Sequence, residues 1–299
     1  TLFLYMEDTY EVNGEPFFGY LRGKYSKEEL KELDDFAYNL GVDLVPNIQT
    51  LAHMATFIRW RADLMDIDDI LLVNDEKVYD LIERMIKSLR ECFRTKKIHI
   101  GMDEAYLLGR GEYYHKHGNR SSNEIIKEHL DRICKIAEPY GYQLLMWSDM
   151  FFRPWNNGRY YTNKVVKVPS DALGALPKSV IPVYWDYYRA HAEDYDAMLK
   201  LHAQFSPNTW FAGGAWCWAG FAPLNQFSIN SMSEAMKACR DNKTKNIFMT
   251  MWATTVWSAP TSHSCRLFTT LRSAREATLT RRKSRQSSRE LSVLTTTTL

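Results

Sequence analysis

The sequence predicts an α/β fold in which parallel strands close into a barrel of the (β/α)8 type. Short apolar segments alternate with amphipathic segments of helical period along most of the chain. The strand segments are nearly all apolar, as expected of a parallel sheet that is covered on both faces. Polar and aromatic residues follow the carboxyl end of one strand after another, so residues far apart in sequence would meet at one mouth. A doubly wound open sheet is the alternative, and it would gather its site at a single switch point.

The first half of the chain is predicted to hold three of the strands. Residues 2–6 read as a strand, and Ser26 and Glu29 then form a capping box that begins a helix ending near Gly41. The next strand is predicted over 42–48, and the third at Ile98–Ile100. The helix predicted between them, at 76–93, has apolar residues at spacings of three and four: Val78, Leu81, Ile82, Met85, Ile86 and Leu89.

The second half continues the alternation. Helices are predicted at 123–139, 193–205 and 231–240, and strands at 143–146, 180–183, 209–212 and 246–251. The prediction is therefore seven strands separated mostly by helices. No glycine-rich phosphate loop follows the first strand, which argues against a nucleotide-binding fold.

The composition favours a soluble protein with one large domain. The chain has 299 residues, 45% of them hydrophobic, which is enough for a substantial core. No apolar run is long enough to cross a membrane and no leader sequence is visible, so we expect a cytoplasmic protein. The cysteines show no metal-ligand spacing, and we expect them to be reduced thiols: Cys92, Cys134, Cys217, Cys239 and Cys265.

Charge and composition divide the chain after Trp252. Residues 253–299 carry a net charge of +6, so residues 1–252 carry −4 and show no basic nucleic-acid surface. The same tail contains 11 Thr, 8 Ser and 7 Arg, a composition that cannot bury a core and predicts disorder. We therefore assign residues 1–252 to a barrel domain and treat 253–299 as a separate tail.

The strongest candidate for chemistry is the adjacent pair Asp103 and Glu104, which follows the short strand Ile98–Ile100. Neighbouring carboxylates repel, so one pKa tends to rise and the other to fall, which separates a proton donor from a permanent anion. An ordinary solvated strand end would also carry such a dipeptide. The surrounding motifs must therefore decide between the two interpretations.

Three motifs in order carry a resemblance to a known family. They are Val45-Pro46-Asn47-Ile48-Gln49-Thr50-Leu51-Ala52-His53, His99-Ile100-Gly101-Met102-Asp103-Glu104 and Met146-Trp147-Ser148-Asp149. Together they resemble segments that follow the third, fourth and fifth strands of family 20 glycoside hydrolases, the β-N-acetylhexosaminidases, and most of all the bacterial exo-hexosaminidase branch. The resemblance covers residues 1–252 and implies a TIM barrel.

The resemblance also implies a reaction. In this family the 2-acetamido carbonyl of the substrate, and not an enzyme carboxylate, attacks the anomeric carbon and forms an oxazoline. Glu104 would then protonate the glycosidic oxygen and later deprotonate water, while Asp103 would accept the acetamido N–H. The implied substrate is a glycan or glycoconjugate ending in GlcNAc or GalNAc.

The resemblance further implies which residues surround this pair. The expected substrate-binding residues are His53, His99, Trp147, Asp149, Trp185, Tyr187, Trp218 and Trp252. The two histidines would hold the acids, the tryptophans would line the sugar pocket, and Tyr187 would donate to the acetamido oxygen. Tyr184 or Tyr188 could take the place of Tyr187, and Trp216 that of Trp218. Asp8 and Asp149 are each expected either to bind sugar hydroxyls or to be ordinary loop acids.

Two departures from the family pattern stand out. The chain begins at what would be the family's second strand, so we expect the first β/α unit to be missing and the barrel to have unpaired edges that impair folding or activity. One inserted nucleotide after the Trp252 codon would restore a string similar to the family's eighth-strand end. We therefore interpret 253–299 as a frameshifted tail, with a native basic tail as the alternative.

Other functions remain as alternatives. An inactive barrel that only binds glycans would keep the aromatic cage without needing both acids. A metal-dependent hydrolase is disfavoured because His53, His99, Asp103 and Glu104 have no compact ligand spacing, and no cofactor is expected. Neither a nucleic-acid nor a membrane partner is expected, and a homodimer is an assembly that the sequence allows.

Overall fold

The computed structural model describes residues 1–220 and 222–252, together with the backbone of 291–296. Eight parallel strands close into a barrel in the order β1-β10-β9-β8-β7-β6-β5-β2. These barrel strands are β1 (Leu2–Tyr5), β2 (Leu44–Asn47), β5 (Lys97–His99), β6 (Gln143–Trp147), β7 (Val180–Trp185), β8 (Trp210–Gly214), β9 (Ile247–Met251) and β10 (Leu291–Thr296). The parallel α/β barrel predicted from the sequence is confirmed, and the open sheet is excluded.

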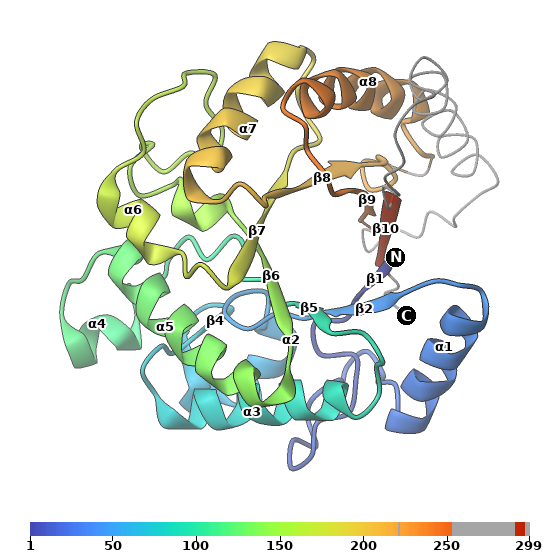
Figure 1. Cartoon of the computed structure of the whole chain (residues 1–299). Coiled ribbons are helices and arrows are strands. Elements are labelled where there is room, and N and C mark those ends of the chain that lie inside the picture. Colours follow the sequence, from blue (N-terminus) through green and yellow to red (C-terminus); the bar gives the residue numbers. More distant parts are fainter. Residues whose placement is uncertain (221, 253–290, 297–299) are drawn as a thin grey trace.

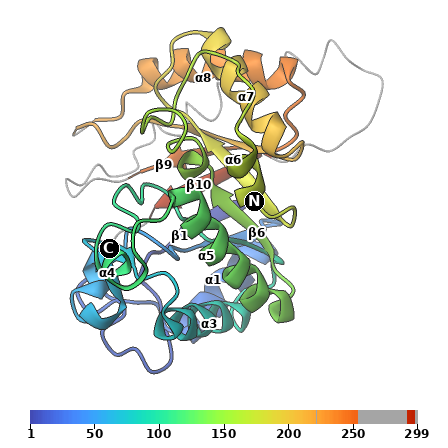
Figure 2. The same cartoon turned by 90° about the vertical axis from the view of Figure 1, so that its left-hand side faces the viewer.

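Helices surround the strands on the outside of the barrel (Figure 1, Figure 2). The longer ones are α1 (Lys27–Asn39), α3 (Glu76–Arg90), α5 (Ser122–Ala137), α7 (Ala192–Phe205) and α8 (Asn225–Asp241). The capping box at Ser26 and Glu29 is present at the start of α1, and a second one joins Ser121 to Glu124 at the start of α5. Helix α8 begins at Asn225, earlier than the predicted Ser231, because its polar first turn lacks an apolar period.

The register aligns the carboxyl ends of neighbouring strands at one level. Asn47 at the end of β2 pairs with His99 at the end of β5, and His99 pairs with Leu145 of β6. Farther round, Trp185 of β7 lies beside Ala212 of β8. The loops that follow these strands therefore share one end of the barrel, where α/β barrels build their sites.

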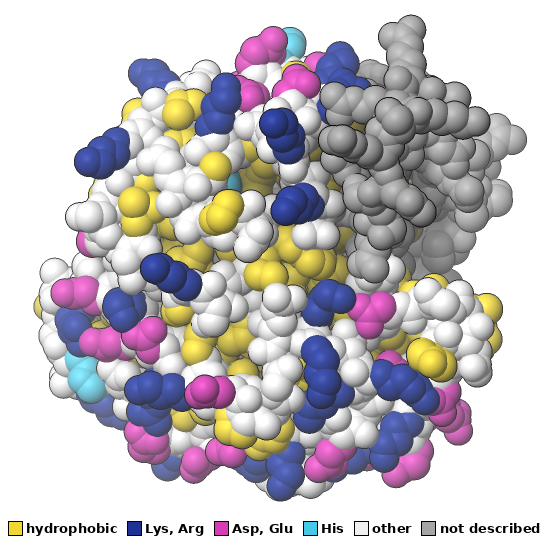
Figure 3. Space-filling view, in the orientation of Figure 1, with side chains coloured by type: hydrophobic (Ala, Val, Ile, Leu, Met, Phe, Trp, Pro, Cys, Tyr) yellow, Lys and Arg dark blue, Asp and Glu magenta, His cyan; other side chains and the backbone are white. Residues whose placement is uncertain are grey.

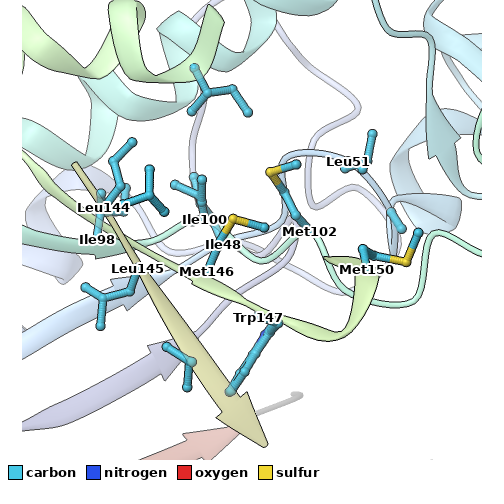
Figure 4. Close-up of a cluster of buried hydrophobic side chains, with 14 of the residues drawn as sticks. Ile48, Leu51, Ile98, Ile100, Met102, Leu144, Leu145, Met146, Trp147 and Met150 are labelled. Atoms are coloured by element: carbon cyan, nitrogen blue, oxygen red, sulfur yellow. The ribbon is translucent and has the colours of Figure 1, made fainter. Parts of the chain in front are cut away.

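Aromatic rings fill much of the barrel interior. Phe3 of β1 stacks on Phe248 of β9 with centroids 4.7 Å apart, and it also contacts the rings of His99 and Trp210. Trp147 contacts His99 at 4.3 Å. Aliphatic side chains of β5, β6 and the loops after them make a neighbouring cluster with Trp147, Met102 and Met150 (Figure 4). The closely packed interior therefore fixes the strand ends.

The loop after β2 contains structure that the sequence did not predict. It holds α2 (Ala55–Ile58), the turn η1 (Ala62–Leu64) and an antiparallel pair, β3 (Met65–Ile67) and β4 (Ile70–Leu71). Later loops contain α4 (Glu112–His117), the turns η2 (Glu138–Tyr140) and η3 (Asp149–Phe151), and α6 (Ser170–Ala175). Elements this short show too little hydrophobic period to be recognised.

One strand comes from the tail. Residues 291–296 form β10, which pairs with β9 on one side and with β1 on the other. The unpaired edges expected at β1 and β9 are therefore absent, which removes that reason for expecting poor folding. Residues 253–290 and 297–299 lie outside the described part, so the frameshift interpretation stays a prediction, which resequencing the gene would test.

The outer surface shows charges of both signs. On the face in Figure 3, Lys and Arg lie interspersed with Asp and Glu, and hydrophobic side chains gather near the middle. Within the described residues, no helix combines the length and the apolar character that crossing a membrane requires. Cys92 and Cys239 are buried, and the four described cysteines form no disulfide with one another.

Candidate active site

The turn after β5 has an unusual backbone. Gly101, Met102 and Glu104 have φ values of 71°, 71° and 55°, in the left-handed region that residues other than glycine rarely adopt. A Cβ on Gly101 would lie 2.0 Å from Oε1 of Gln49, so only glycine fits between β5 and the loop after β2. His53, in that loop, also has a positive φ, 58°. Strained backbone of this kind concentrates at functional sites.

Asp103 is held by groups from the loop after β2. Its Oδ1 accepts a hydrogen bond from Nε2 of Gln49 at 2.8 Å, and its Oδ2 lies 3.3 Å from Nε2 of His53. Nε2 of Gln49 also donates to the hydroxyl of Tyr5, and Oε1 of Gln49 accepts from the backbone N–H of Met102. Gln49 therefore links β1, the loop after β2 and the acid-bearing turn.

The opposite charges of Asp103 and His53 stabilise each other. Burial acts to lower the pKa of His53, but the carboxylates of Asp103 and Glu104 outweigh it and raise that pKa to about 10. Burial acts to raise the pKa of Asp103, but the His53 cation and the Gln49 amide hold it below its ordinary value. Asp103 is therefore an anion at neutral pH, and His53 is its cation.

Glu104 is held differently, from the opposite side. Its side chain is 36% exposed, against 14% for Asp103. The hydroxyl of Tyr106 donates to Oε1 at 2.7 Å, and Nε2 of His53 is 3.7 Å from Oε2, too far for a good hydrogen bond. The backbone N–H of Glu104 donates to Oδ2 of Asp149. The Glu104 carboxyl is therefore the more accessible of the two to a ligand.

Asp149 lies behind the acids. It is fully buried, and burial together with the Asp103 carboxylate raises its pKa to about 7. Its Oδ2 accepts from Nε of Arg153 at 3.2 Å as well as from Glu104. Oδ2 thus orients the Glu104 backbone, whereas Oδ1 has no hydrogen-bond partner among the described residues. The expectation that Asp149 binds a sugar hydroxyl stays a prediction.

His99 lies beneath the turn that carries the acids. It is fully buried between Phe3 and Trp147, and burial lowers its pKa to about 3, so it is neutral. Its Nδ1 accepts from the backbone N–H of Gly101 at 3.1 Å. Through this bond His99 supports the turn that carries Asp103. Its Nε2 has no hydrogen-bond partner among the described residues, and a contact between His99 and a substrate stays a prediction.

The predicted aromatic residues do converge. Trp252 at the end of β9 lies edge-on to Tyr5 at 5.1 Å and 6.1 Å from Trp147. Tyr187 stacks on Trp185 with centroids 5.6 Å apart, and it meets Trp218 edge-on at 5.6 Å. Burial raises the pKa of Tyr187, and the Asp103 carboxylate adds to this shift. We call Trp147, Trp185, Tyr187, Trp218 and Trp252 the aromatic wall, and it stands next to the acid pair.

The alternatives left open by the sequence differ in their surroundings. Tyr184 is buried and donates to Asp186, while Tyr188 is 46% exposed. Trp216 stacks on Trp218 at 4.6 Å and donates through Nε1 to the carbonyl of Tyr187, so it lies behind the wall.

Asp8, the other loop acid considered, is buried. It accepts hydrogen bonds from Arg22 and from the backbone N–H of Gly19. These contacts stabilise the loop after β1, which leaves Asp8 poorly placed to bind a sugar hydroxyl.

Sequence reasoning missed four residues that position the acids. Gln49 lies within the recognised motif but has no titratable group to attract attention. Tyr106 and Arg153 bracket Glu104 from two loops, and Asp66 of β3 accepts three backbone N–H groups from the loop after Glu104. Asp66 stands between the apolar residues Met65 and Ile67 in the sequence, which is only a weak indication of a buried acid.

Comparisons with known proteins identify the family of the chain. The model of glycosyl hydrolase family 20, catalytic domain, matches residues 10–168, more than half of the chain. The chain belongs to glycosyl hydrolase family 20. The match covers the loops after β1, β2, β5 and β6, and therefore both acids and most residues that hold them.

Individual relatives of this family 20 chain are distant. It is 26% identical to hexosaminidase D of Bos taurus over an alignment of 235 positions, which covers 72% of this chain and only 62% of the bovine protein. The fold resembles that of the family 20 exo β-N-acetylglucosaminidase of Vibrio harveyi, with a TM-score of 0.54, 14% identity and coverage of 71% of this chain and 36% of the other. It also resembles a chitobiase of Flavobacterium johnsoniae, with a TM-score of 0.53, 14% identity and coverage of 95% and 48%.

Proposed function

We propose that this family 20 chain is a retaining exo-β-N-acetylhexosaminidase that removes terminal β-linked GlcNAc or GalNAc. The observation that carries the proposal is the unequal setting of two adjacent carboxyls. Asp103 is a locked anion paired with His53, whereas Glu104 is more exposed and accepts a single hydroxyl donor. Neighbouring carboxyls cannot flank a glycosidic bond from opposite faces, but they suit a substrate that supplies its own nucleophile.

The steps follow from these positions. Glu104 gives its proton to the glycosidic oxygen while the acetamido oxygen of the substrate bonds to the anomeric carbon and the leaving sugar departs. The Asp103 anion accepts the acetamido N–H and stabilises the positive charge of the oxazolinium ring. Glu104, now a carboxylate, removes a proton from water, which attacks the anomeric carbon, reopens the ring and restores the original configuration.

The aromatic wall supports a sugar with an apolar substituent. Tyr187, Trp185 and Trp252 offer ring faces and edges beside Asp103, where the acetamido methyl group would pack. The buried indole N–H groups of Trp147 and Trp185 have no hydrogen-bond partner among the described residues. Unpartnered buried donors of this kind favour a site completed by a polar ligand.

The strands can be matched to those of the family barrel. We take β1 as the counterpart of the family's second strand, so that β10 occupies the place of the first. The catalytic unit is then residues 1–252, with β10 completing the ring of strands.

The test uses the 299-residue chain. After circular dichroism has shown a folded protein, release of nitrophenol is measured from the 4-nitrophenyl β-glycosides of GlcNAc, GalNAc and glucose. We expect turnover of the first two and none of the glucoside, which lacks the acetamido group. Asp103→Asn should lower kcat/KM with these substrates by roughly 100- to 10,000-fold, and Glu104→Gln should cause a loss of about that size with N,N′-diacetylchitobiose, whose sugar leaving group needs protonation.

The matched control is Glu112→Gln, the same chemical change at an exposed carboxylate of α4, which should leave turnover intact. Turnover of the glucoside would contradict substrate assistance. Binding of GlcNAc in calorimetry without any turnover by the wild type would instead support the inactive glycan-binding barrel.

A further inference from the structure

Tyr106, two residues after Glu104, is poorly explained by packing. Its side chain is 57% exposed, yet its hydroxyl donates a 2.7 Å hydrogen bond to Oε1 of Glu104. Its backbone N–H also donates to the carbonyl of Glu104, which closes a tight turn between the two residues. An exposed tyrosine gains little from burial, so this geometry needs another cause.

Arg153 fixes the tyrosine from the loop after β6. Its guanidinium lies over the Tyr106 ring, 4.3 Å from the centroid, and its Nη2 donates to the hydroxyl at 3.2 Å. The same guanidinium donates through Nε to Asp149 and through Nη1 to the carbonyl of Gly158. With only 17% of its side chain exposed, Arg153 is a firm support for the tyrosine.

These contacts form a closed ring around Glu104. Asp149 accepts from the Glu104 backbone, Arg153 joins Asp149 to Tyr106, and Tyr106 returns to the Glu104 side chain. The backbone and the carboxyl of Glu104 are thus held by one hydrogen-bonded network of Asp149, Arg153 and Tyr106. None of the hydrogen bonds in this network involves Asp103 or Gln49. A catalytic acid must be held to within a fraction of an ångström, and this ring supplies that restraint.

We propose that Tyr106, locked by Arg153, is the positioning residue for the acid and base Glu104, a role that rests on the function proposed above. Because Oε1 accepts from Tyr106, the transferable proton of Glu104 is carried by Oε2. When that proton moves to the glycosidic oxygen, negative charge develops on the carboxyl, and a hydrogen bond to a charged acceptor is stronger than one to a neutral acceptor. Tyr106 therefore stabilises the transition state of proton transfer more than the ground state.

The inference predicts a dependence on the leaving group. A sugar leaving group needs protonation by Glu104, whereas 2,4-dinitrophenolate departs without it. For Tyr106→Phe we therefore expect kcat/KM to fall by about 10- to 100-fold with N,N′-diacetylchitobiose. With 2,4-dinitrophenyl β-GlcNAc the fall should be less than about twofold, because kcat/KM then reports a step that needs no acid.

Two further variants complete the experiment. Tyr114→Phe removes the hydroxyl of another half-exposed tyrosine, in α4, and should change neither substrate's kcat/KM. Arg153→Lys retains a cation for Asp149 but loses the planar group over the ring. Arg153→Lys should cause part of the loss in kcat/KM that Tyr106→Phe causes with chitobiose. The double variant Tyr106→Phe/Arg153→Lys should have a kcat/KM within about twofold of that of Tyr106→Phe, because both changes act through one contact.

The outcomes separate the two proposals. Equal losses on both substrates would show that Tyr106 is merely structural, and no loss on either would show that it is dispensable. Both results overturn this inference while leaving the hydrolase intact. A folded wild type that cleaves neither substrate would contradict the proposed function itself, and this inference would fall with it.

Discussion

The two acids of the site are neighbours in sequence but belong to different halves of the mouth. Asp103 is held by the loop after β2, through Gln49 and His53, and indirectly by Tyr5 at the end of β1. Glu104 is held by the loops after β5 and β6, through Tyr106 and the Asp149–Arg153 pair. One peptide bond therefore separates two distinct environments.

The difference shows how adjacency can produce two chemical roles. The Asp103 half surrounds its carboxyl with a cation and an amide, which keep it ionised and still. The Glu104 half leaves its carboxyl accessible and gives it a neutral hydroxyl donor, which suits a group that must gain and lose a proton. The left-handed backbone of Met102 and Glu104 turns the two side chains toward these separate partners.

The largest effect should come from Gly101→Ala, which disturbs both halves at once. The new Cβ would meet Oε1 of Gln49 at 2.0 Å and the carbonyl of Ile48 at 2.7 Å, in a backbone with φ of 71°. We expect a loss of about 3 kcal/mol or more in the free energy of unfolding, measured in urea, and no measurable turnover.

Gly141→Ala is the matched control. Gly141 has a φ of 67°, but a Cβ there meets nothing within 4 Å. It should cost only about 1 kcal/mol and keep activity. Equal losses for the two variants would mean that the close approach of β5 to Gln49 is unimportant.

The Asp103 half alone is tested by Gln49→Met, which keeps the length of the side chain and removes its donor and acceptor. Asp103 then loses its 2.8 Å partner, and the Met102 N–H loses its acceptor. We expect kcat to fall by about 100-fold with both the disaccharide and the dinitrophenyl substrate, because the acetamido group needs Asp103 whatever the leaving group. Gln143→Met, at the opposite end of β6, is the control; a leaving-group dependence like that of Tyr106→Phe would contradict the division into halves.

The sequence predicted the fold well because its signals there are strong and local. Seven barrel strands and the long helices followed from apolar period and caps, as at Ser26. The eighth strand, β10, was missed because the segment 291–296 is short and lies in a tail whose composition predicts disorder.

The site was predicted in its acids and in part of its surroundings. His53 lies beside Asp103, where it was expected to hold the acid, and the buried side chains of His99 and Asp149 hydrogen-bond the backbone of the acid-bearing turn. The shape of this turn depends on positive φ at Met102 and Glu104, which the sequence does not reveal for residues other than glycine. Partners such as Tyr106 and Arg153 meet only through tertiary packing, so no spacing rule could join them.

The support of the Glu104 half is tested by Asp66→Asn. The buried carboxylate of Asp66 accepts the backbone N–H groups of Gly109, Gly111 and Tyr113 at 2.8, 3.2 and 2.8 Å. An amide would turn a donor toward at least one of these N–H groups, so we expect a loss of about 2 kcal/mol in the free energy of unfolding. Asp63→Asn changes an exposed carboxylate next to the same hairpin and should cost less than about 1 kcal/mol. If both variants unfold at the same urea concentration, the hairpin does not secure the acid-bearing loop.

The smallest effect concerns Asp149, the residue that lies behind both acids, and it appears as a dependence on pH. The folded pKa of Asp149 is raised from 3.8 to about 7, so between these values the folded protein retains a proton that the unfolded chain has released. This residue therefore makes stability decrease as the pH rises through that window, and Asp149→Asn removes the decrease. Relative to the wild type, the variant's Tm should rise by roughly 2–4 °C between about pH 4.5 and pH 7.5. Asp131→Asn, an exposed carboxylate of α5 paired with Lys127, should keep the wild-type slope. Parallel slopes for Asp149→Asn and the wild type would mean that Asp149 is ionised throughout, and that the Asp103 anion does not act on the Glu104 half through it.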